Sequence, residues 1–228
     1  MGMDAHDGHR QRLRERFLKT GLNGFAEYEI VELLLTLCIP RMDVKPLAKE
    51  LIRKFGTVKN IIEQKPERLM EINGIGSHSI TCIKIIKALS EYYLFQKSSE
   101  LPILRDNATL INFWRAKIGF LQTEVFEVAF LNSAYQLLPN GVERIEEGIA
   151  QQTHIYPQKI LKSAIAHNAV NLVIAHNHPS GNPQPSHNDI TLTNAIKTTC
   201  SILGIRLVDH VIITHDSYYS FRESGLLA

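Results

Sequence analysis

The feature that most constrains the fold of this chain is a short apolar run, Leu172 to Ala175, which ends in His-Asn-His-Pro-Ser-Gly at residues 176–181. The run is partly β-branched and turn residues follow it, which is typical of a buried strand. Residues two apart on a strand point to the same side, so the spacing predicts that His176 and His178 share one face beyond the strand's end.

A second part of the pattern lies at the start of a helix predicted for residues 188–203. Asp189 follows Ser186 by three residues, which is the spacing of a helix cap, and the pair alone is explained equally well by capping. Capping does not explain a second histidine at the two-residue spacing. Two neutral imidazoles and a carboxylate form a three-ligand zinc set with a fourth position open for water. We therefore predict one Zn²⁺ per chain, bound by His176, His178 and Asp189.

The motif is similar to one in known enzymes. His176-x-His178, then seven residues, then Ser186-x-x-Asp189 matches the JAMM (MPN-plus) metalloprotease motif, spacing included. The hexapeptide at 176–181 together with a downstream Asp-His pair resembles the RadC family in particular, and the resemblance covers nearly the whole chain. It implies a mixed sheet flanked by helices in the C-terminal part and a helix-hairpin-helix in the N-terminal part.

The resemblance also implies catalytic roles. The serine, Ser186, would help stabilise an oxyanion, and an upstream glutamate would act as general acid and base on zinc-bound water. Glu124 is the first candidate because the family's glutamate sits where an apolar strand begins, and Glu127 is the alternative. The implied reaction is hydrolysis of a peptide or isopeptide bond in a protein or peptide substrate.

Asp209 and His210 lie inside the strand predicted for residues 205–214, after the motif helix. From there His210 could reach the metal ligands as a second-shell or substrate-contacting residue. A buried histidine with satisfied hydrogen bonds is the alternative interpretation.

The N-terminal half contains an apolar-Asn-Gly-Ile-Gly sequence at residues 72–76, between predicted helices at 66–71 and 77–95. Gly74 and Gly76 would let the backbone turn tightly and expose N–H groups at a helix start, where a phosphate can sit. Lys84 on the following helix could add a phosphate contact. The pattern permits nonspecific DNA contact through phosphates, and it is equally compatible with a scaffold or a protein-docking element.

The arrangement of elements predicts an α+β protein with two domains, 1–99 all-helical and 100–228 carrying the zinc site. Residues 97–105 are polar, contain a proline and are predicted to form the linker. Residues 1–9 are predicted to be a disordered tail. Asn140-Gly141 predicts a hairpin turn before a strand at 142–148.

Composition limits the remaining classes. Hydrophobic residues make up 44% of the chain, so a core can form, and the net charge of +2 does not single out a partner. Three widely spaced cysteines are typical of reduced thiols, and no signal peptide or membrane-spanning stretch is visible, so a cytoplasmic protein without membrane contact is expected. A DNA-binding, repair-associated module and a metal-dependent nuclease remain alternatives to the peptidase.

Overall fold

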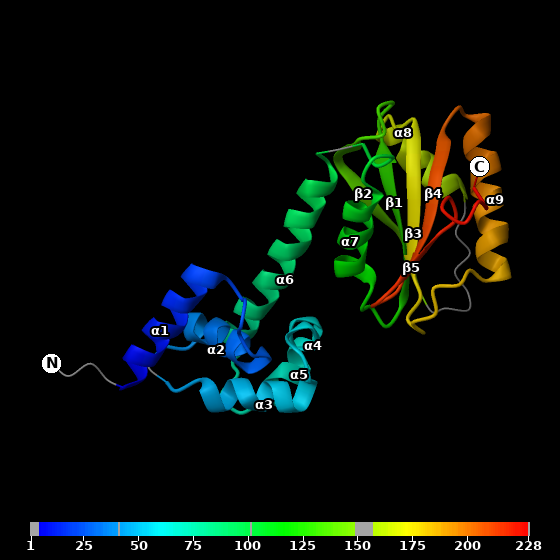
Figure 1. The fold of residues 1–228 in the computed structure, drawn as a ribbon. Coiled ribbons are helices and arrows are strands. Elements are labelled where there is room, and N and C mark those ends of the chain that lie inside the picture. Colours follow the sequence, from blue (N-terminus) through cyan, green and yellow to red (C-terminus); the bar gives the residue numbers. More distant parts are fainter. Residues whose placement is uncertain (1–4, 41, 101, 149–156, 228) are drawn as a thin grey trace. The chain divides into compact units, whose positions relative to one another are not determined.

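A computed structural model describes residues 5–40, 42–100, 102–148 and 157–227. The fold is α+β, as predicted, with helices alone in the N-terminal part and a five-stranded mixed sheet in the C-terminal part (Figure 1). The chain divides into two compact units after Leu89. The predicted boundary at residues 99 and 100 falls ten residues further along.

The N-terminal unit is built around an aliphatic core. Its buried side chains include Leu35, Leu51 and Ile83, which are fully buried. Its elements are α1 (Ala5–Thr20), α2 (Glu27–Cys38), α3 (Lys45–Phe55), α4 (Val58–Glu63), α5 (Pro66–Met70) and the first part of α6 (Ser77–Ser98).

The prediction of a disordered tail is wrong for residues 5–9, which belong to α1. His9, near the start of α1, contacts a buried carboxylate: its Nε2 lies 2.7 Å from Oε1 of Glu32. A buried acid on α2 thus provides a partner that the polar composition of the segment does not reveal. Residues 1–4 lie outside the described residues.

The C-terminal unit contains α7 (Asn107–Ile118), β1 (Glu124–Leu131), β2 (Leu137–Gly148), α8 (Pro157–Ala166), β3 (Asn171–Asn177), α9 (His187–Ile202), β4 (Arg206–Ile213) and β5 (Tyr218–Ser220). The strand order is β2-β1-β3-β4-β5. Among the described strands, only the β3–β4 pair is parallel, and α9 forms the crossover between these two strands.

The sheet is covered on both faces. Trp114 and Ile118 of α7 pack on one face, with Val125 of β1. Ile160 of α8 and Ile196 of α9 pack on the other face, together with the aliphatic side chains of β3 that point to that face. Strands with both faces buried read as continuous apolar runs, which is why β3 is recognisable in the sequence.

The predicted hairpin turn at Asn140-Gly141 is wrong. The turn between β1 and β2 lies at residues 132–136, where the N–H of Asn132 donates to the carbonyl of Gln136 at 3.0 Å. Asn140, with φ of 52°, and Gly141 form an irregularity within β2. A Cβ on Gly141 would lie 2.5 Å from the carbonyl oxygen of Leu138, so glycine is required there for close packing rather than for a hairpin.

A β-bulge interrupts the pairing of β3 with β4. Leu172 pairs with Leu207 and Val173 pairs with Asp209, so Val208 is the extra residue. Because one inserted residue reverses the alternation, Leu207 and His210 both face α8 and α9 although they are three positions apart. The bulge therefore aims His210 toward the helix that carries Asp189.

Within the described ranges, no helix combines the length and the apolar character that crossing a membrane requires.

Candidate metal centre

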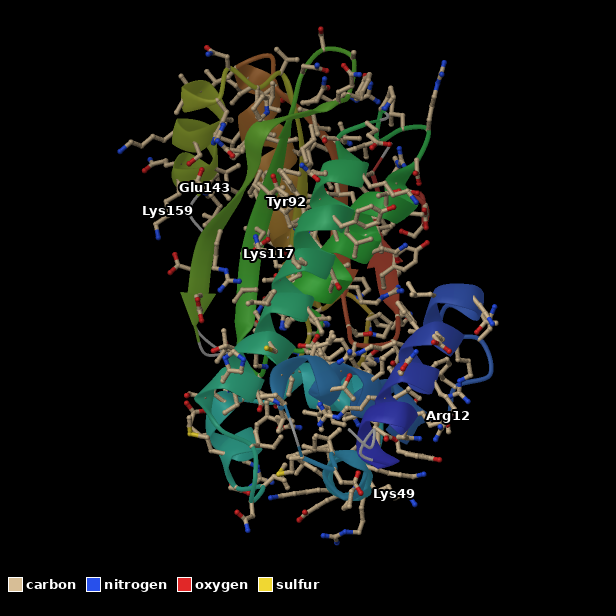
Figure 2. The ribbon with its side chains drawn as sticks, turned by 90° about the vertical axis from the view of Figure 1, so that its left-hand side faces the viewer. Arg12, Lys49, Tyr92, Lys117, Glu143 and Lys159 are labelled. Atoms are coloured by element: carbon tan, nitrogen blue, oxygen red, sulfur yellow. The ribbon has the colours of Figure 1, made fainter. Side chains whose placement is uncertain are left out.

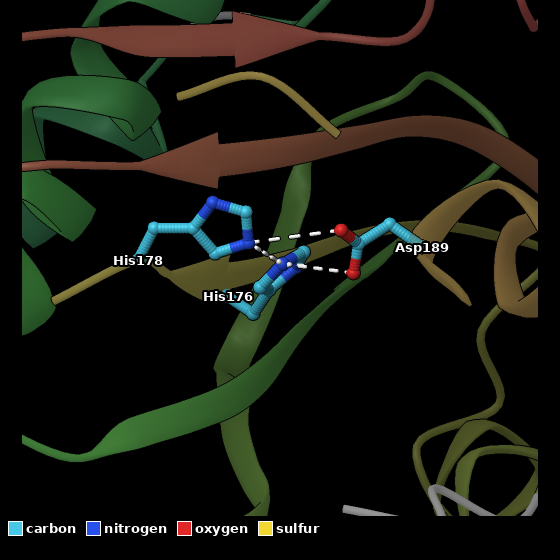
Figure 3. Close-up of side chains that lie close together, drawn as sticks. All are labelled: His176, His178 and Asp189. Atoms are coloured by element: carbon cyan, nitrogen blue, oxygen red, sulfur yellow. Dashed lines mark hydrogen bonds and ion pairs between the residues drawn. The ribbon is translucent and has the colours of Figure 1, made fainter. Parts of the chain in front are cut away.

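The end of β3 and the start of α9 bring the three predicted ligands together. Nε2 of His176 lies 3.0 Å from Nε2 of His178 and 3.2 Å from Oδ1 of Asp189, and His178 Nε2 lies 3.7 Å from Oδ2 (Figure 3). One ligand atom from each residue can be chosen so that all three lie within 4.8 Å of one another. The cluster could hold a metal ion.

The helix cap and the ligand cluster share one carboxylate. Both the N–H and the hydroxyl of Ser186 donate to Oδ2 of Asp189 at 2.7 Å, and the N–H of Asp189 donates back to the Ser186 hydroxyl at 3.2 Å. The capping box therefore forms, and it leaves Oδ1 directed at His176. Capping and ligation are compatible functions of Asp189, because each uses a different carboxylate oxygen.

The donor set fits a cation. Nδ1 of His178 lies 2.8 Å from the carbonyl oxygen of Asn182. A carbonyl only accepts, so Nδ1 carries the hydrogen and Nε2 of the neutral ring presents a lone pair to the cluster. A metal-binding histidine is usually supported in this way, by a hydrogen bond from the ring nitrogen that does not bind the metal. Lone pairs and a carboxylate thus converge on one point, and a divalent cation would satisfy them together.

Without metal, the electrostatics of the cluster favour the carboxylate form of Asp189 and a proton on His178, which a bound cation would displace. Burial lowers the pKa of His178, but the Asp189 carboxylate, the Asn182 carbonyl and the charge of Glu124 outweigh burial and leave that pKa above its ordinary value. Burial raises the pKa of Asp189, but hydrogen bonds from His176, His178 and Ser186 hold it well below its usual range. Asp189 is therefore a carboxylate at neutral pH.

Glu124 lies on the same side of the sheet as the histidines. Phe126 of β1 pairs with His176 of β3, so Glu124, two residues earlier, points to the same face as His176 near the strand's open end. The side chain is half-buried, and its charge acts on His178. This placement suits the proton-transfer role that the sequence assigned to Glu124.

Glu127, the alternative, points to the opposite face. It is fully buried on the α7 side, where its carboxylate contacts Lys117 Nζ at 2.9 Å and Arg144 Nε at 3.2 Å. Lys117, labelled in Figure 2, extends from α7 toward β1. The strict alternation of β1 thus separates Glu127 from the cluster.

Asn177, which the sequence analysis did not single out, organises the segment around Glu124. It is fully buried, and its Oδ1 accepts from the N–H of Val125 at 2.8 Å. Its Nδ2 donates to the carbonyls of Thr123 at 3.1 Å and Leu121 at 3.3 Å. A polar residue between two histidines on an otherwise apolar strand was the signal for this role.

Of the predicted pair at 209–210, only His210 contacts the cluster. It is fully buried, with Nε2 2.8 Å from His176 Nδ1 and Nδ1 2.6 Å from Oγ1 of Thr193. Burial lowers the pKa of His210 well below the ordinary value, with the His176 charge adding to the effect. His210 is therefore neutral and lies directly behind one predicted ligand.

Asp209 faces away from the metal centre. Its carboxylate accepts from the Ser220 hydroxyl at 2.6 Å and from the N–H groups of Arg222 and His210 at 2.9 and 2.8 Å. Burial raises the pKa of Asp209. Its contacts fasten β4 to β5 and the residues that follow, so Asp209 supports the fold.

The hairpin residues lie in the N-terminal unit. Gly74 has a φ of 94°, which favours glycine, and Gly76 lies just before α6 with open space where a Cβ would be. The ammonium of Lys84 donates to the carbonyl of Ile62 at 2.8 Å and to that of Gln64. Lys84 therefore caps the C-terminal carbonyls of α4, and these hydrogen bonds lie within the N-terminal unit.

Two family matches cover most of the chain. Residues 104–226 match the RadC-like JAB domain, and residues 8–81 match the UPF0758 N-terminal domain. The C-terminal unit is thus a JAB-type domain, with the His-His-Asp cluster at the end of its central strand.

Relatives match over nearly their full length. A UPF0758 protein of Fusobacterium nucleatum subsp. nucleatum is 40% identical, and the match covers 100% of both chains. A UPF0758 protein of Ruegeria pomeroyi is 36% identical over 96% of this chain and 97% of the relative, and one of Rhodobacter capsulatus is 35% identical over 94% and 100%. The chain belongs to the UPF0758 family of proteins with a RadC-like JAB domain.

Proposed function

We propose that this protein is a zinc-dependent hydrolase of peptide or isopeptide bonds in a protein or peptide substrate. The observation that carries the proposal is the convergence of His176 Nε2, His178 Nε2 and the Asp189 carboxylate, with a half-buried glutamate on the same face. Two imidazoles and one carboxylate are a ligand set used by catalytic zinc, which keeps a fourth position open.

When bound, zinc would supply a Lewis acid that lowers the pKa of a coordinated water to about 7. Glu124 would take a proton at its carboxylate and return it to the leaving amine. Because it lies on the face of the cluster without being one of the three converging ligands, it is placed for proton transfer rather than for metal binding.

Ser186 would donate its hydroxyl hydrogen to the oxyanion of the tetrahedral intermediate. That hydrogen is directed to Asp189 Oδ2 in the structure, so a rotation of the side chain would precede the donation. A donor of this kind contributes about 3 kcal/mol to transition-state stabilisation in comparable sites. Ser186 is exposed, which leaves the hydroxyl accessible to a substrate.

We also place the activity in the cytoplasm, where thiols stay reduced. Cys38, Cys82 and Cys200 are all free, and two of them are buried. Burial raises the pKa of Cys200 to about 11, which keeps it an unreactive thiol in the core.

The test is Glu124→Gln in the full-length zinc-loaded protein. The variant should retain one zinc per chain while hydrolysis of peptide and isopeptide-linked substrates falls by about 100- to 10,000-fold. Glu146→Gln is the matched control, because Glu146 lies on the neighbouring strand and its half-buried carboxylate pairs with Lys159 rather than with the cluster; the activity of this variant should be unchanged.

Three outcomes would contradict the proposal. Loss of zinc in Glu124→Gln would make Glu124 a ligand, and cleavage of duplex or single-stranded DNA without amide hydrolysis would identify a metal-dependent nuclease instead. Absence of both activities in zinc-loaded protein would favour the non-enzymatic, DNA repair-associated alternative.

A further inference from the structure

The two histidines of the cluster differ in what supports them. Nδ1 of His178 contacts a carbonyl, which fixes its hydrogen, whereas Nδ1 of His176 contacts a ring nitrogen of His210 at 2.8 Å. A neutral imidazole nitrogen can donate or accept, so this contact by itself does not decide which nitrogen of His176 carries the hydrogen. The position of this hydrogen matters, because only a ring nitrogen with a free lone pair can bind a metal ion.

Thr193 resolves the ambiguity from one residue further away. Its Oγ1 lies 2.6 Å from Nδ1 of His210 and 2.5 Å from the main-chain carbonyl oxygen of Asp189. The carbonyl has no hydrogen to offer, so the single hydroxyl hydrogen of Thr193 must point at it. Oγ1 then has only lone pairs left for His210, and the hydrogen in that contact must come from His210 Nδ1.

We propose that Thr193 and His210 set the tautomer of His176 and thereby keep its Nε2 free to bind metal. With the hydrogen of His210 on Nδ1, its Nε2 is an acceptor, so His176 must donate through Nδ1. This direction places one hydrogen in each of the three contacts. The reverse direction would place two oxygen acceptors 2.5 Å apart with none between them.

Local geometry holds this series of hydrogen-bonded residues in place. Asp189 and Thr193 are four residues apart on α9 and therefore share one helix face. The ring of His210 stacks on Phe221, with centroids 4.7 Å apart and an interplanar angle of 13°, so it is held in one plane. Thr193 is 2% exposed and His210 0% exposed, which excludes water as a competing partner. Both positioning residues act through His176 rather than on a substrate.

The purpose of this arrangement rests on the proposed metal site, but the tautomers themselves can be observed without metal. Nitrogen chemical shifts of isotope-labelled histidine distinguish a protonated ring nitrogen from one with a lone pair. The measurement uses the full-length zinc-free protein at about pH 8.5, some two units above the ordinary pKa of free histidine. We expect His176 and His210 both to carry hydrogen on Nδ1.

Thr193→Val tests the cause, because valine keeps the branched shape and removes the hydroxyl. The Nδ1 hydrogen of His210 would then be buried without an acceptor, which is unfavourable. The pair should reverse, so that His210 donates through Nε2 and His176 carries its hydrogen on the metal-facing nitrogen. Thr193→Ser keeps the hydroxyl and should keep the wild-type tautomers.

Zinc affinity gives an independent readout. Loss of a group that supports a metal ligand typically weakens metal binding about 10- to 100-fold, and we expect that loss for Thr193→Val. Thr193→Ser should stay near the wild-type affinity. Thr199→Val is the matched control on the same helix, because the hydroxyl of the half-buried Thr199 makes a solvent-exposed hydrogen bond to the Ala195 carbonyl at 2.7 Å.

Three results would overturn the proposal: no hydrogen on Nδ1 of His176 in the wild-type protein, unchanged tautomers in Thr193→Val, or equal loss of zinc affinity in the valine and serine variants. If Thr193→Val fails to fold, the wild-type spectrum and Thr193→Ser decide. Wild-type tautomers as expected without zinc binding would refute the proposed function and leave the tautomer assignment standing.

Discussion

The helix-hairpin-helix region of the N-terminal unit and the metal centre of the C-terminal unit each contain polar side chains that belong to a recognisable sequence motif. The two regions differ in what these side chains contact. In the hairpin unit, Lys84 closes the end of α4, and Lys87 pairs with Glu63 at 2.5 Å. In the metal centre, the supporting contacts turn Nε2 of His178 and the carboxylate of Asp189 toward one another.

The difference shows how a functional cluster can be separated from a structural one. A motif residue whose hydrogen bonds end on neighbouring carbonyls or carboxylates is satisfied within the fold. In the metal centre, imidazole nitrogens and a carboxylate oxygen from different elements face one another around a common point, where a cation could replace their mutual contacts. By this criterion the metal centre is the stronger functional candidate.

The largest expected effect sharpens the metal side of the comparison. His176→Ala should reduce zinc from one per chain to near zero in metal analysis of the purified protein, because it removes one of three ligands. His187→Ala is the control, since this exposed histidine at the start of α9 lies next to Ser186 but outside the cluster. A full equivalent of zinc in His176→Ala would show that the ligand assignment is wrong.

A second experiment tests whether the buried ion pairs of Glu127 with Lys117 and Arg144 contribute to stability rather than to metal binding. Glu127→Gln should lower the free energy of unfolding of the C-terminal unit by about 3 kcal/mol, the low end for breaking a buried pair. The low end is expected because Lys117 and Arg144 are 28% and 35% exposed and can turn to water. Zinc content should stay at one per chain.

Glu147→Gln provides the matched comparison for Glu127. It removes another partner of Arg144, but Glu147 is 56% exposed, so a loss between about 0 and 1 kcal/mol is expected from thermal unfolding. Equal losses in the two variants would show that burial of Glu127 does not make it more important than a surface carboxylate.

Lys84→Met tests the same idea in the hairpin unit. Methionine retains the apolar stem and removes the donor to the carbonyls of Ile62 and Gln64. Because water can replace part of that donation, local stability should fall by about 1 kcal/mol. Hydrogen exchange in α4 should then be faster by about fivefold. The exposed Lys65 is the control position; an equal effect of Lys65→Met would contradict the specific role of Lys84.

The smallest expected effect is DNA binding by the hairpin. With Lys84 and Lys87 engaged, contact would depend on main-chain N–H groups near Gly76, so affinity should be weak, insensitive to sequence and steeply dependent on salt. Titration of the full-length protein with duplex DNA at low and moderate salt measures it. Gly76→Val should weaken binding without changing zinc content. No binding at low salt would leave the hairpin as a scaffold or docking element.

The sequence predicted the contacts that depend on spacing along one element or across one turn. His176 and His178 are two apart at the end of a strand, and Ser186 and Asp189 are three apart at a helix start, so local geometry determines which way each pair points. The choice between Glu124 and Glu127 also follows from strand alternation once the pairing of β1 with β3 is known.

Contacts that depend on pairing between distant segments could not be predicted in this way. Thr193 looks like any helix threonine until β4 brings His210 against it, and the register of that strand depends on the inserted Val208. Asn140-Gly141 misled for a related reason, because the same dipeptide suits both a hairpin turn and an irregular strand.

The bulge at Val208 makes the metal centre sensitive to the length of the chain as well as to its residues. Removing Val208 would leave every residue of the His-His-Asp motif in place and would allow β3 and β4 to pair evenly. Either Leu207 or His210 would then turn to the α7 side, since a shift of one residue moves a strand's side chains to the opposite face. A relative could therefore keep the complete motif in an alignment and still lack the support of His176, and a one-residue gap in β4 would be the only trace of that loss.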